Sequence, residues 1–400
     1  MTIKVRGNTS ARYAKKPFKI KLEKKADLLL RNDKNLRDKN WVLLRDANQL
    51  LEAGFIIGDA SGLQWAPAYE WVNVIINSDY RGVYLLAEAV ERNETCRIRT
   101  AETGFVTERD AYWWNENGEY LNSCWLPQFG WTMKYPDFED FTEEQKSYVQ
   151  NTLFEFENVL NTSDYENLVD IDSFCQWLIC QDILGTSDGG GTNLYIAKYD
   201  NTPESKLFVP VLWDVDSAEE AIDRWSGVHG EPVIKLLFEN ENRSFLKHYV
   251  QLYNEVSNDL YTAWRNSAEK LLTEEYLAYN NSAKLNNVRW SEAPDKVNYA
   301  SINGVRILNW IESRKSWLDK TVDELESSLA RVPGISDDTD AFLNVSIEGD
   351  LLQIDSSHPE VSIWRVDGRM IYSGCPGVLD LPDHGVYVIR SGELSKKFIF

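Results

Sequence analysis

The chain has 400 residues, of which 43% are hydrophobic and 26% are charged, so it is long enough for two or three globular domains. Its net charge of -21 argues against nucleic acid and anionic lipid as partners, since both repel an acidic protein, and favours cations such as metal ions. No run of about 18 apolar residues is present, so membrane insertion is not expected.

The first 135 residues show the alternation of apolar and polar side chains that is typical of strands. Strands are predicted at the start of the chain and at 18–22, and residues 71–76 and 83–86 are predicted to form a hairpin across a turn-rich connection. One helix is predicted after Asp46, a candidate helix cap. This part is therefore expected to be a sheet with one helix, and it begins as if a strand were entered part-way, which predicts an N-terminal truncation.

From about residue 141 the pattern becomes helical. Thr142 followed by Gln145 has the spacing of a capping box and predicts a helix to about Leu160. Asp170 or Asp172 is expected to cap a second helix that ends near residue 184. More helices are predicted between 244 and 326, and the last of them carries an apolar stripe. The stripe consists of Ile307, Ile311, Leu318, Val322 and Leu325.

The end of the chain differs in composition from the rest. Residues 329–341 combine Pro, Gly and acidic residues and predict a linker. Residues 342–400 contain short alternating segments separated by turns, which predict a small all-β sandwich domain. The five Cys form no CxxC pair and the four His are scattered, so neither structural zinc nor a disulfide framework is expected.

A glycine-rich segment, Asp188-Gly-Gly-Gly-Thr-Asn193, lies between the helix predicted at 170–184 and a predicted strand at 193–197. A phosphate-binding P-loop requires GxxxxGK[ST] between a strand and a helix, and a dinucleotide fingerprint requires a following helix N-terminus. Neither requirement is met. The glycines are instead expected to let the backbone pass closely between Asp188 and Asn193.

The two ends of this segment have the separation of the catalytic-loop Asp and Asn in protein kinases, and a predicted hairpin then leads to Asp214 and Asp216. Phosphoryl transfer needs hard oxygen ligands around Mg²⁺ and one carboxylate at the nucleophile, and needs no His or Cys. Asp188 is therefore the candidate catalytic residue. Asn193, Asp214 and Asp216 are candidate ligands for Mg²⁺ or another divalent metal.

Two other interpretations of these residues stay open at this point. In the first, the segment is an Asx-type turn, and Asp214 and Asp216 only end a strand. In the second, the protein is a hydrolase with paired carboxylates, because alternate residues of a strand share a face at about 6–7 Å. The many Trp residues are expected to fill cores, although some could stack on sugars.

Several segments resemble, in order, the CotH kinase family over about residues 5–325. They are RGNTS at 6–10, KKPFKIK at 15–21, WVLL at 41–44, NSDYRGVYLLAE at 77–88, GFVTE at 104–108, KYP at 134–136 and PVLWDVD at 210–216. The resemblance implies an α+β, atypical protein-kinase-like fold of two lobes. Residues 1–135 would form the mostly β N-lobe and residues 136–328 the mostly α C-lobe with the catalytic and metal loops.

The same resemblance implies that ATP donates phosphate to Ser or Thr of a protein substrate, whose identity the sequence does not give. It assigns Asp188 to catalysis and Asn193 with Asp214 or Asp216 to the metal. It also implies nucleotide contacts, with the loop from Arg6 to Ser10 over the phosphates. The implied nucleotide-binding residues are Arg6, Ser10, Lys19, Glu88 and Lys134; Lys21 shares a strand face with Lys19, so the choice between these two lysines stays open.

The chain departs from the family pattern at three places. The helix after WVLL has Leu50-Leu-Glu-Ala53 where the family has Arg-Asn, Ala89 follows Glu88 where the family has Lys, and Ser217 follows the WDVD segment in place of Phe-Gly or a similar pair. Fewer basic groups near a nucleotide leave its phosphates less neutralised. The alternative hypothesis is therefore a catalytically weak pseudokinase that acts as a surface binding or scaffold protein.

Residues 342–400 resemble the C-terminal sorting modules of exported Bacteroidetes-type proteins. The segments that carry the resemblance are VSIWRVDGR at 361–369, GVYVIR at 385–390 and KKFIF at 396–400. It implies a secreted or cell-surface protein that engages an export machinery through this domain. The chain shows no signal-peptide pattern at its first residues.

Overall fold

The computed structural model describes residues 1–115, 120–125, 127–189, 191–330, 342–348, 351–366, 368–381, 385–392 and 394–400. The chain forms two compact units, Met1–Glu326 and Ser327–Phe400. The first unit combines sheets with a helical middle part, and the second is built of β-strands after the end of the last helix. The predicted α+β class with a terminal all-β part is confirmed, whereas most of the predicted linker, 331–341, lies outside the described residues.

The first sheet contains five antiparallel strands in the order β1-β2-β3-β5-β4. Asn77 and Ser78 join β4 to β5, and both have the positive φ that a two-residue hairpin turn requires. The predicted hairpin is confirmed, with a tighter turn than the sequence indicated. The strands are β1 (Thr2–Val5), β2 (Phe18–Ala26), β3 (Asp38–Leu44), β4 (Tyr69–Ile76) and β5 (Asp79–Glu88).

The second sheet joins strands from distant parts of the chain in the order β10-β9-β6-β8-β7. The strand that follows the glycine-rich segment, β9, pairs with β6, so Tyr195 lies opposite Glu108. The predicted strand at 207–212 is shorter than expected, since only its first two residues form a ladder. The strands are β6 (Phe105–Asp110), β7 (Tyr120–Leu121), β8 (Gly130–Tyr135), β9 (Leu194–Lys198) and β10 (Leu207–Phe208).

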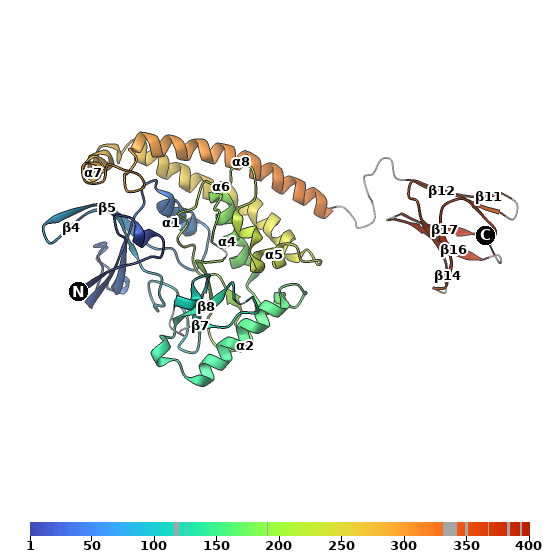
Figure 1. The fold of residues 1–400 in the computed structure, drawn as a ribbon, viewed down its shortest axis with the longest axis horizontal. Coiled ribbons are helices and arrows are strands. Elements are labelled where there is room, and N and C mark those ends of the chain that lie inside the picture. Colours follow the sequence, from blue (N-terminus) through green and yellow to red (C-terminus); the bar gives the residue numbers. More distant parts are fainter. Residues whose placement is uncertain are drawn as a thin grey trace. The chain divides into compact units, whose positions relative to one another are not determined.

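The helices of the first unit surround the sheets. In Figure 1, α6 and α8 run along one side of this unit, and α2 lies on the opposite side near β7 and β8. The capping box of Thr142 and Gln145 is present at the start of α2, as predicted. The helices are α1 (Leu50–Ala60), α2 (Glu143–Val159), α3 (Tyr165–Leu168), α4 (Ile171–Leu184), α5 (Pro232–Phe238), α6 (Ser244–Leu272), α7 (Tyr276–Arg289) and α8 (Ala300–Ala330).

One hydrophobic core connects the two sheets with α1 and with the segment that leads to Asp214. Val42 of β3, Val106 of β6 and Phe55 of α1 pack in the same cluster as Trp213. Burial of such side chains stabilises the fold by about 1.5–3 kcal/mol each. The core therefore fixes the backbone that immediately precedes the candidate metal-binding carboxylates.

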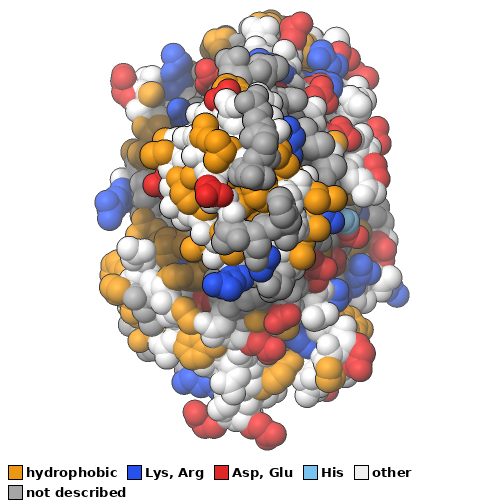
Figure 2. Space-filling view, turned by 90° about the vertical axis from the view of Figure 1, so that its right-hand side faces the viewer, with side chains coloured by type: hydrophobic (Ala, Val, Ile, Leu, Met, Phe, Trp, Pro, Cys, Tyr) orange, Lys and Arg blue, Asp and Glu red, His pale blue; other side chains and the backbone are white. Residues whose placement is uncertain are grey.

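The second unit consists of two antiparallel sheets that share one core. Leu352, Ile363 and Ile389 are buried in it. Figure 2 shows hydrophobic side chains on one face of the molecule, and this unit exposes Leu351 and Val378. Its strands are β11 (Leu343–Glu348), β12 (Leu351–Ser356), β13 (Val361–Arg365), β14 (Met370–Gly374), β15 (Val378–Leu379), β16 (Val386–Ser391) and β17 (Leu394–Ile399). Its role in export stays a prediction.

Within the described residues, no helix is both long and apolar enough to cross a bilayer.

Candidate active site

The loop that carries Asp188 begins where α4 ends. Gly185 takes a left-handed conformation, with φ of 62°, and its N–H bonds back to the carbonyl of Gln181 at 2.8 Å. This is the usual way in which a glycine ends a helix. A Cβ at this position would lie 2.8 Å from the carbonyl oxygen of Ala221, so the loop also passes close to the next segment. Glycine is required here on both grounds.

The Asp188 loop and the segment after Trp213 are joined by direct hydrogen bonds. Ser217 donates from Oγ to Asp188 Oδ1 at 2.5 Å, and the same Oγ accepts from the Asp188 N–H at 3.2 Å. The carbonyl of Ser217 accepts from the Ser187 N–H at 3.3 Å, and that of Leu184 accepts from the Glu219 N–H at 2.7 Å. The structure thus brings together two acidic segments whose residues Asp188 and Asp214 are 26 positions apart in the sequence.

Burial and neighbouring carboxylates raise the pKa of Asp214 and of Asp216. Burial, Asp188 and Glu108 raise the pKa of Asp214, while the guanidinium of Arg6 acts in the opposite direction. Burial and the charges of Asp214 and Asp188 raise the pKa of Asp216 to about 7, although the Asp216 side chain is still open to solvent. Within the described chain, neither Asp214 nor Asp216 forms a salt bridge in the structure. The site therefore carries negative charge that a cation would neutralise.

The hydrolase interpretation required Asp214 and Asp216 to alternate along a strand. The structure corrects this, because neither residue lies in a strand and Asp214 has a left-handed backbone with φ of 53°. Packing against α1 explains the conformation of this segment. A Cβ on Gly54 would lie 2.3 Å from Val215 Cγ2, so the helix backbone and the acidic segment are in close contact.

The N-terminal Arg-Gly-Asn-Thr-Ser turn reaches the same site. The Arg6 guanidinium lies 5.8 Å from the centre of the Trp213 ring, and its charge acts on Asp214. Gly7 has φ of 85°, and a Cβ there would lie 2.1 Å from Ser10 Oγ. Arg6 is thus brought to the carboxylates, while Ser10 lies at the start of a one-turn 3-10 helix, Ser10–Arg12, that closes the turn.

Lys134 is linked to the site through Glu108. The Lys134 ammonium lies 2.7 Å from Glu108, and Glu108 is the residue opposite Tyr195 whose charge also raises the pKa of Asp214. Sequence reasoning gave Glu108 no role, although it ends the GFVTE segment that carries part of the family resemblance. A glutamate that faces a lysine on the adjacent strand cannot be recognised before the pairing of β6 and β8 is known.

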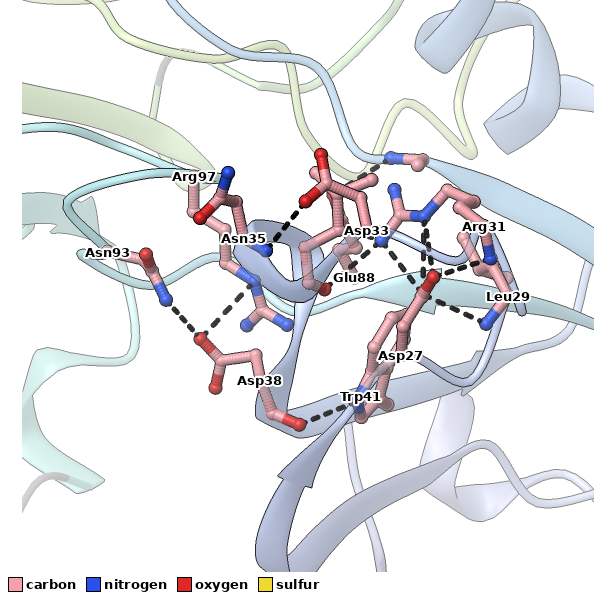
Figure 3. Close-up of polar contacts among 12 residues, drawn as sticks. Asp27, Leu29, Arg31, Asp33, Asn35, Asp38, Trp41, Glu88, Asn93 and Arg97 are labelled. Atoms are coloured by element: carbon pink, nitrogen blue, oxygen red, sulfur yellow. Dashed lines mark hydrogen bonds and ion pairs between the residues drawn. The ribbon is translucent and has the colours of Figure 1, made fainter.

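Lys19 and Glu88 lie in other contacts. Lys19, on the β2 position opposite Val42, is 3.8 Å from Glu91. Glu88 is buried and binds Arg31 at 2.8 Å, and it also accepts from the Ala68 N–H at 3.1 Å. Figure 3 shows the Glu88 carboxylate beside Arg31 and Asp27. The structure therefore places the predicted Glu88 in a buried ion-pair cluster with the loop after β2.

Asn193, the second end of the glycine-rich segment, directly precedes β9. Its backbone is left-handed, with φ of 63°, and its side chain is half-buried. A Cβ on Gly191 would lie 2.7 Å from Phe129 and 3.0 Å from Glu231, so the loop passes close to both residues. The buried guanidinium of Arg109 lies 4.2 Å from the centre of the Phe129 ring. Arg109 is a further residue that the sequence pattern did not reveal.

The acidic residues of the site suit a divalent metal that is shared with a nucleotide. Among the described residues, no group of three His, Cys, Asp or Glu side chains could hold a metal ion by itself. Mg²⁺ in kinase-type sites is bound by one or two carboxylates, waters and the phosphates of the nucleotide. Asp214 and Asp216, whose pKa values are raised by burial and by neighbouring carboxylates, fit this requirement better than that of a closed protein cage.

The α+β unit thus places Asp188 beside a segment with two further carboxylates, and Arg6 lies next to that segment. The family model described as CotH kinase protein matches residues 3–318, and the chain therefore belongs to the CotH kinase family. The resemblance deduced from the sequence is confirmed. A search of curated proteins finds no match to the chain.

Proposed function

We propose that this protein is a kinase that uses ATP and a divalent metal to phosphorylate Ser or Thr of a protein substrate. Family membership supports the kinase class. The observation that carries the proposal for this chain is the pair of hydrogen bonds between Ser217 and Asp188. They hold the candidate catalytic carboxylate beside the candidate metal-binding segment, which is the relation that phosphoryl transfer requires.

In the proposed reaction Asp188 acts on the acceptor. Its side chain is exposed, so a substrate hydroxyl has access to it, and the bond from Ser217 fixes its orientation. Asp188 would accept the proton of the Ser or Thr hydroxyl. The hydroxyl oxygen would then bond to the γ-phosphorus while the bond from that phosphorus to ADP breaks and ADP leaves. A metal ion held by Asp214 and Asp216, with Asn193 as the third candidate, would neutralise charge on the phosphates.

Positive groups for the nucleotide come from two directions. Arg6 lies at Asp214, and Lys134 is paired with Glu108. Both cations are balanced by carboxylates of the site, so the nucleotide would bind best together with its metal, which compensates those carboxylates. This reasoning predicts that ATP without divalent metal binds weakly.

The test is transfer of labelled γ-phosphate from ATP, with Mg²⁺ or Mn²⁺, to the protein itself and to a mixed protein acceptor. Asp188→Asn keeps the size of the side chain and is expected to lower the rate by about 100-fold or more. Asp223→Asn, an exposed aspartate on the adjoining segment, is the matched control and should leave the rate unchanged. Equal labelling by wild type and Asp188→Asn, or labelling by neither, contradicts the proposal.

The pseudokinase alternative is favoured by one specific observation. Glu88 is paired with Arg31 and Lys19 lies near Glu91, so two of the implied nucleotide-binding residues are engaged in other contacts. In this alternative the chain binds nucleotide and metal, or a surface partner, without turnover. A rise in Tm with ATP and Mn²⁺ in a protein that transfers no label would support it, whereas measurable transfer that depends on Asp188 would exclude it.

A further inference from the structure

A cavity of about 390 Å³ lies between β4 and α7, and its lining residues do not include those of the Asp188 loop. Its volume falls in the range of small-molecule sites, about 300–1,000 Å³. Its walls combine aromatic rings with carboxylates. The lining residues that matter for its chemistry are Glu52, Tyr69, Glu70, Trp71, Glu275 and Tyr279.

The aromatic walls are held in place by packing. Trp71 and Tyr279 meet edge to face, with ring centres 5.7 Å apart at 87°, and Tyr69 packs on Phe55 at 5.6 Å. Aromatic faces attract ammonium and guanidinium groups, and the attraction is largest where water is excluded. The rings thus provide a preformed surface for an organic cation.

Two of the cavity's carboxylates, Glu52 and Glu70, have no ion-pair partner among the described residues, whereas Glu275 is paired with Lys270. Glu52 is only 7% exposed and accepts a hydrogen bond from Gln49 Nε2 at 2.9 Å. Burial and the charge of Asp46 raise the pKa of Glu52 to about 7, against the hydrogen bond that Gln49 donates. In the part of the chain that the structure describes, neither Glu52 nor Glu70 forms an ion pair.

Two further observations point to a ligand. Trp71 Nε1 is buried and has no partner in hydrogen-bond geometry, so a donor in the wall is unused. At the rim, the Lys270 ammonium lies 2.6 Å from Glu275 with its side chain more than half exposed. An alkylammonium is therefore already held at the mouth, while the buried Glu52 remains unpaired.

The type of cation follows from the lining. Among the described residues, no set of three His, Cys, Asp or Glu side chains could hold a metal ion, and the aromatic rings offer no metal ligands. An alkylammonium needs fewer ligands, since a carboxylate binds its charge and aromatic rings cover its carbon stem. The cavity thus fits an organic amine rather than a bare ion.

We propose that this cavity binds an alkylammonium group, with Glu52 and Glu70 as its carboxylates and Trp71 and Tyr279 as its aromatic walls. The ligand is a free diamine or the lysine side chain of a protein, which share this chemistry. Glu52 comes from the Leu50–Ala53 stretch, where the chain departs from the Arg-Asn of its family. The site is independent of phosphoryl transfer and does not rest on the proposed function.

Calorimetric titration of the full chain tests the proposal. The probes are 1,5-diaminopentane and Nα-acetyl-lysine methylamide, and their neutral comparators are 1,5-pentanediol and the Nε-acetylated lysine compound. Saturable binding of an ammonium probe and none of its comparator is expected. Tighter binding of the diamine identifies a free amine as the ligand class, and tighter binding of the lysine compound identifies a protein side chain.

Variants locate the binding. Glu52→Gln is expected to weaken it at least about ten-fold, because it removes a buried charge partner. Glu70→Gln, at an exposed position that the fold tolerates, is expected to weaken it several-fold, and Glu312→Gln, an exposed glutamate of α8, should leave it unchanged. Absence of binding by both probes, equal binding of the neutral comparators, or affinity unchanged in a folded Glu52→Gln and in Glu70→Gln overturns the proposal.

Discussion

The hydroxyl of Ser217 donates a 2.5 Å hydrogen bond to Asp188 Oδ1 and accepts one from the Asp188 N–H at 3.2 Å. One side chain therefore fixes both the backbone and the carboxylate of the candidate catalytic residue. Ser217 occupies the position at which the chain departs from the family pattern after WDVD. The serine at this position therefore does more than replace the residues of the family pattern, because it connects the two acidic segments.

Replacement of Ser217 by alanine removes this connection. We expect Ser217→Ala to lower the free energy of unfolding by about 1–3 kcal/mol, since the Asp188 N–H loses its partner. Phosphate transfer should fall more than nucleotide affinity, because the change affects the orientation of Asp188. Urea unfolding and initial rates measure the two effects. Ser301→Ala, at an exposed position of α8, is the control, and equal stability of both variants would contradict the assigned role.

Two glycines of α1 provide a matched pair for the packing of the acidic segment. A Cβ at Gly54 would lie 2.3 Å from Val215 Cγ2, whereas at Gly58 the nearest atom, Leu212 Cβ, is at 3.4 Å. Gly54→Ala is expected to destabilise the protein by about 1–3 kcal/mol through overpacking. Gly58→Ala meets ordinary contact distance and should gain up to about 1 kcal/mol in helix propensity.

The position of Asp216 should respond to the same pair. Displacement of Val215 moves its neighbour, so Gly54→Ala should weaken the increase in Tm that Mn²⁺ produces, while Gly58→Ala should not. Thermal unfolding with and without the metal makes the comparison. If both variants behave alike in stability and in metal response, α1 does not determine the position of the segment.

Features that depend on neighbouring residues were predicted from the sequence. The capping box of Thr142 and Gln145, the β4–β5 hairpin and the buried Ile307, Ile311 and Leu318 of α8 follow from short-range patterns. The strand expected at 207–212 was too long. Val209 and Val211 follow β10 and are buried in the core without being part of a strand ladder. A run of apolar residues does not show whether it pairs as a strand or only packs in the core.

Features that depend on pairing across the fold were not accessible from the sequence. Glu88 and Arg31 are separated by 57 positions, and nothing in either local pattern indicates that they meet. The same holds for Lys134 and Glu108 until β6 and β8 are known to be neighbours. The order of Asp188, Asp214 and Asp216 along the chain indicated phosphoryl-transfer chemistry. That Ser217 joins the two segments could be seen only in the folded structure.

The Glu88–Arg31 pair is predicted to stabilise the first unit. Arg31→Met should lower the free energy of unfolding by about 3 kcal/mol, because it leaves the buried Glu88 carboxylate without its cation. Adding Glu88→Gln should recover part of the loss. Lys320→Met disrupts the exposed pair with Glu324 and should change stability by less than about 1 kcal/mol. A double variant no more stable than Arg31→Met would contradict direct coupling.

The raised pKa of Asp216, about 7, predicts how stability depends on pH in the absence of metal. The folded carboxyl binds its proton more tightly than the unfolded one, whose pKa is about 3.9. The stability that this proton contributes is therefore fully present below about pH 4 and is lost as the pH rises through 7.

Asp216→Asn should therefore be more stable than wild type at about pH 8, by about 1 kcal/mol after solvent screening. Near pH 4 the two should be equal. Divalent metal should stabilise the wild type more than Asp216→Asn, which keeps Asp214 but lacks the second carboxylate. Urea unfolding across this range provides the measurement, with Asp223→Asn as the exposed control. Parallel pH curves for wild type and Asp216→Asn would show that the acidic segment carries no excess negative charge.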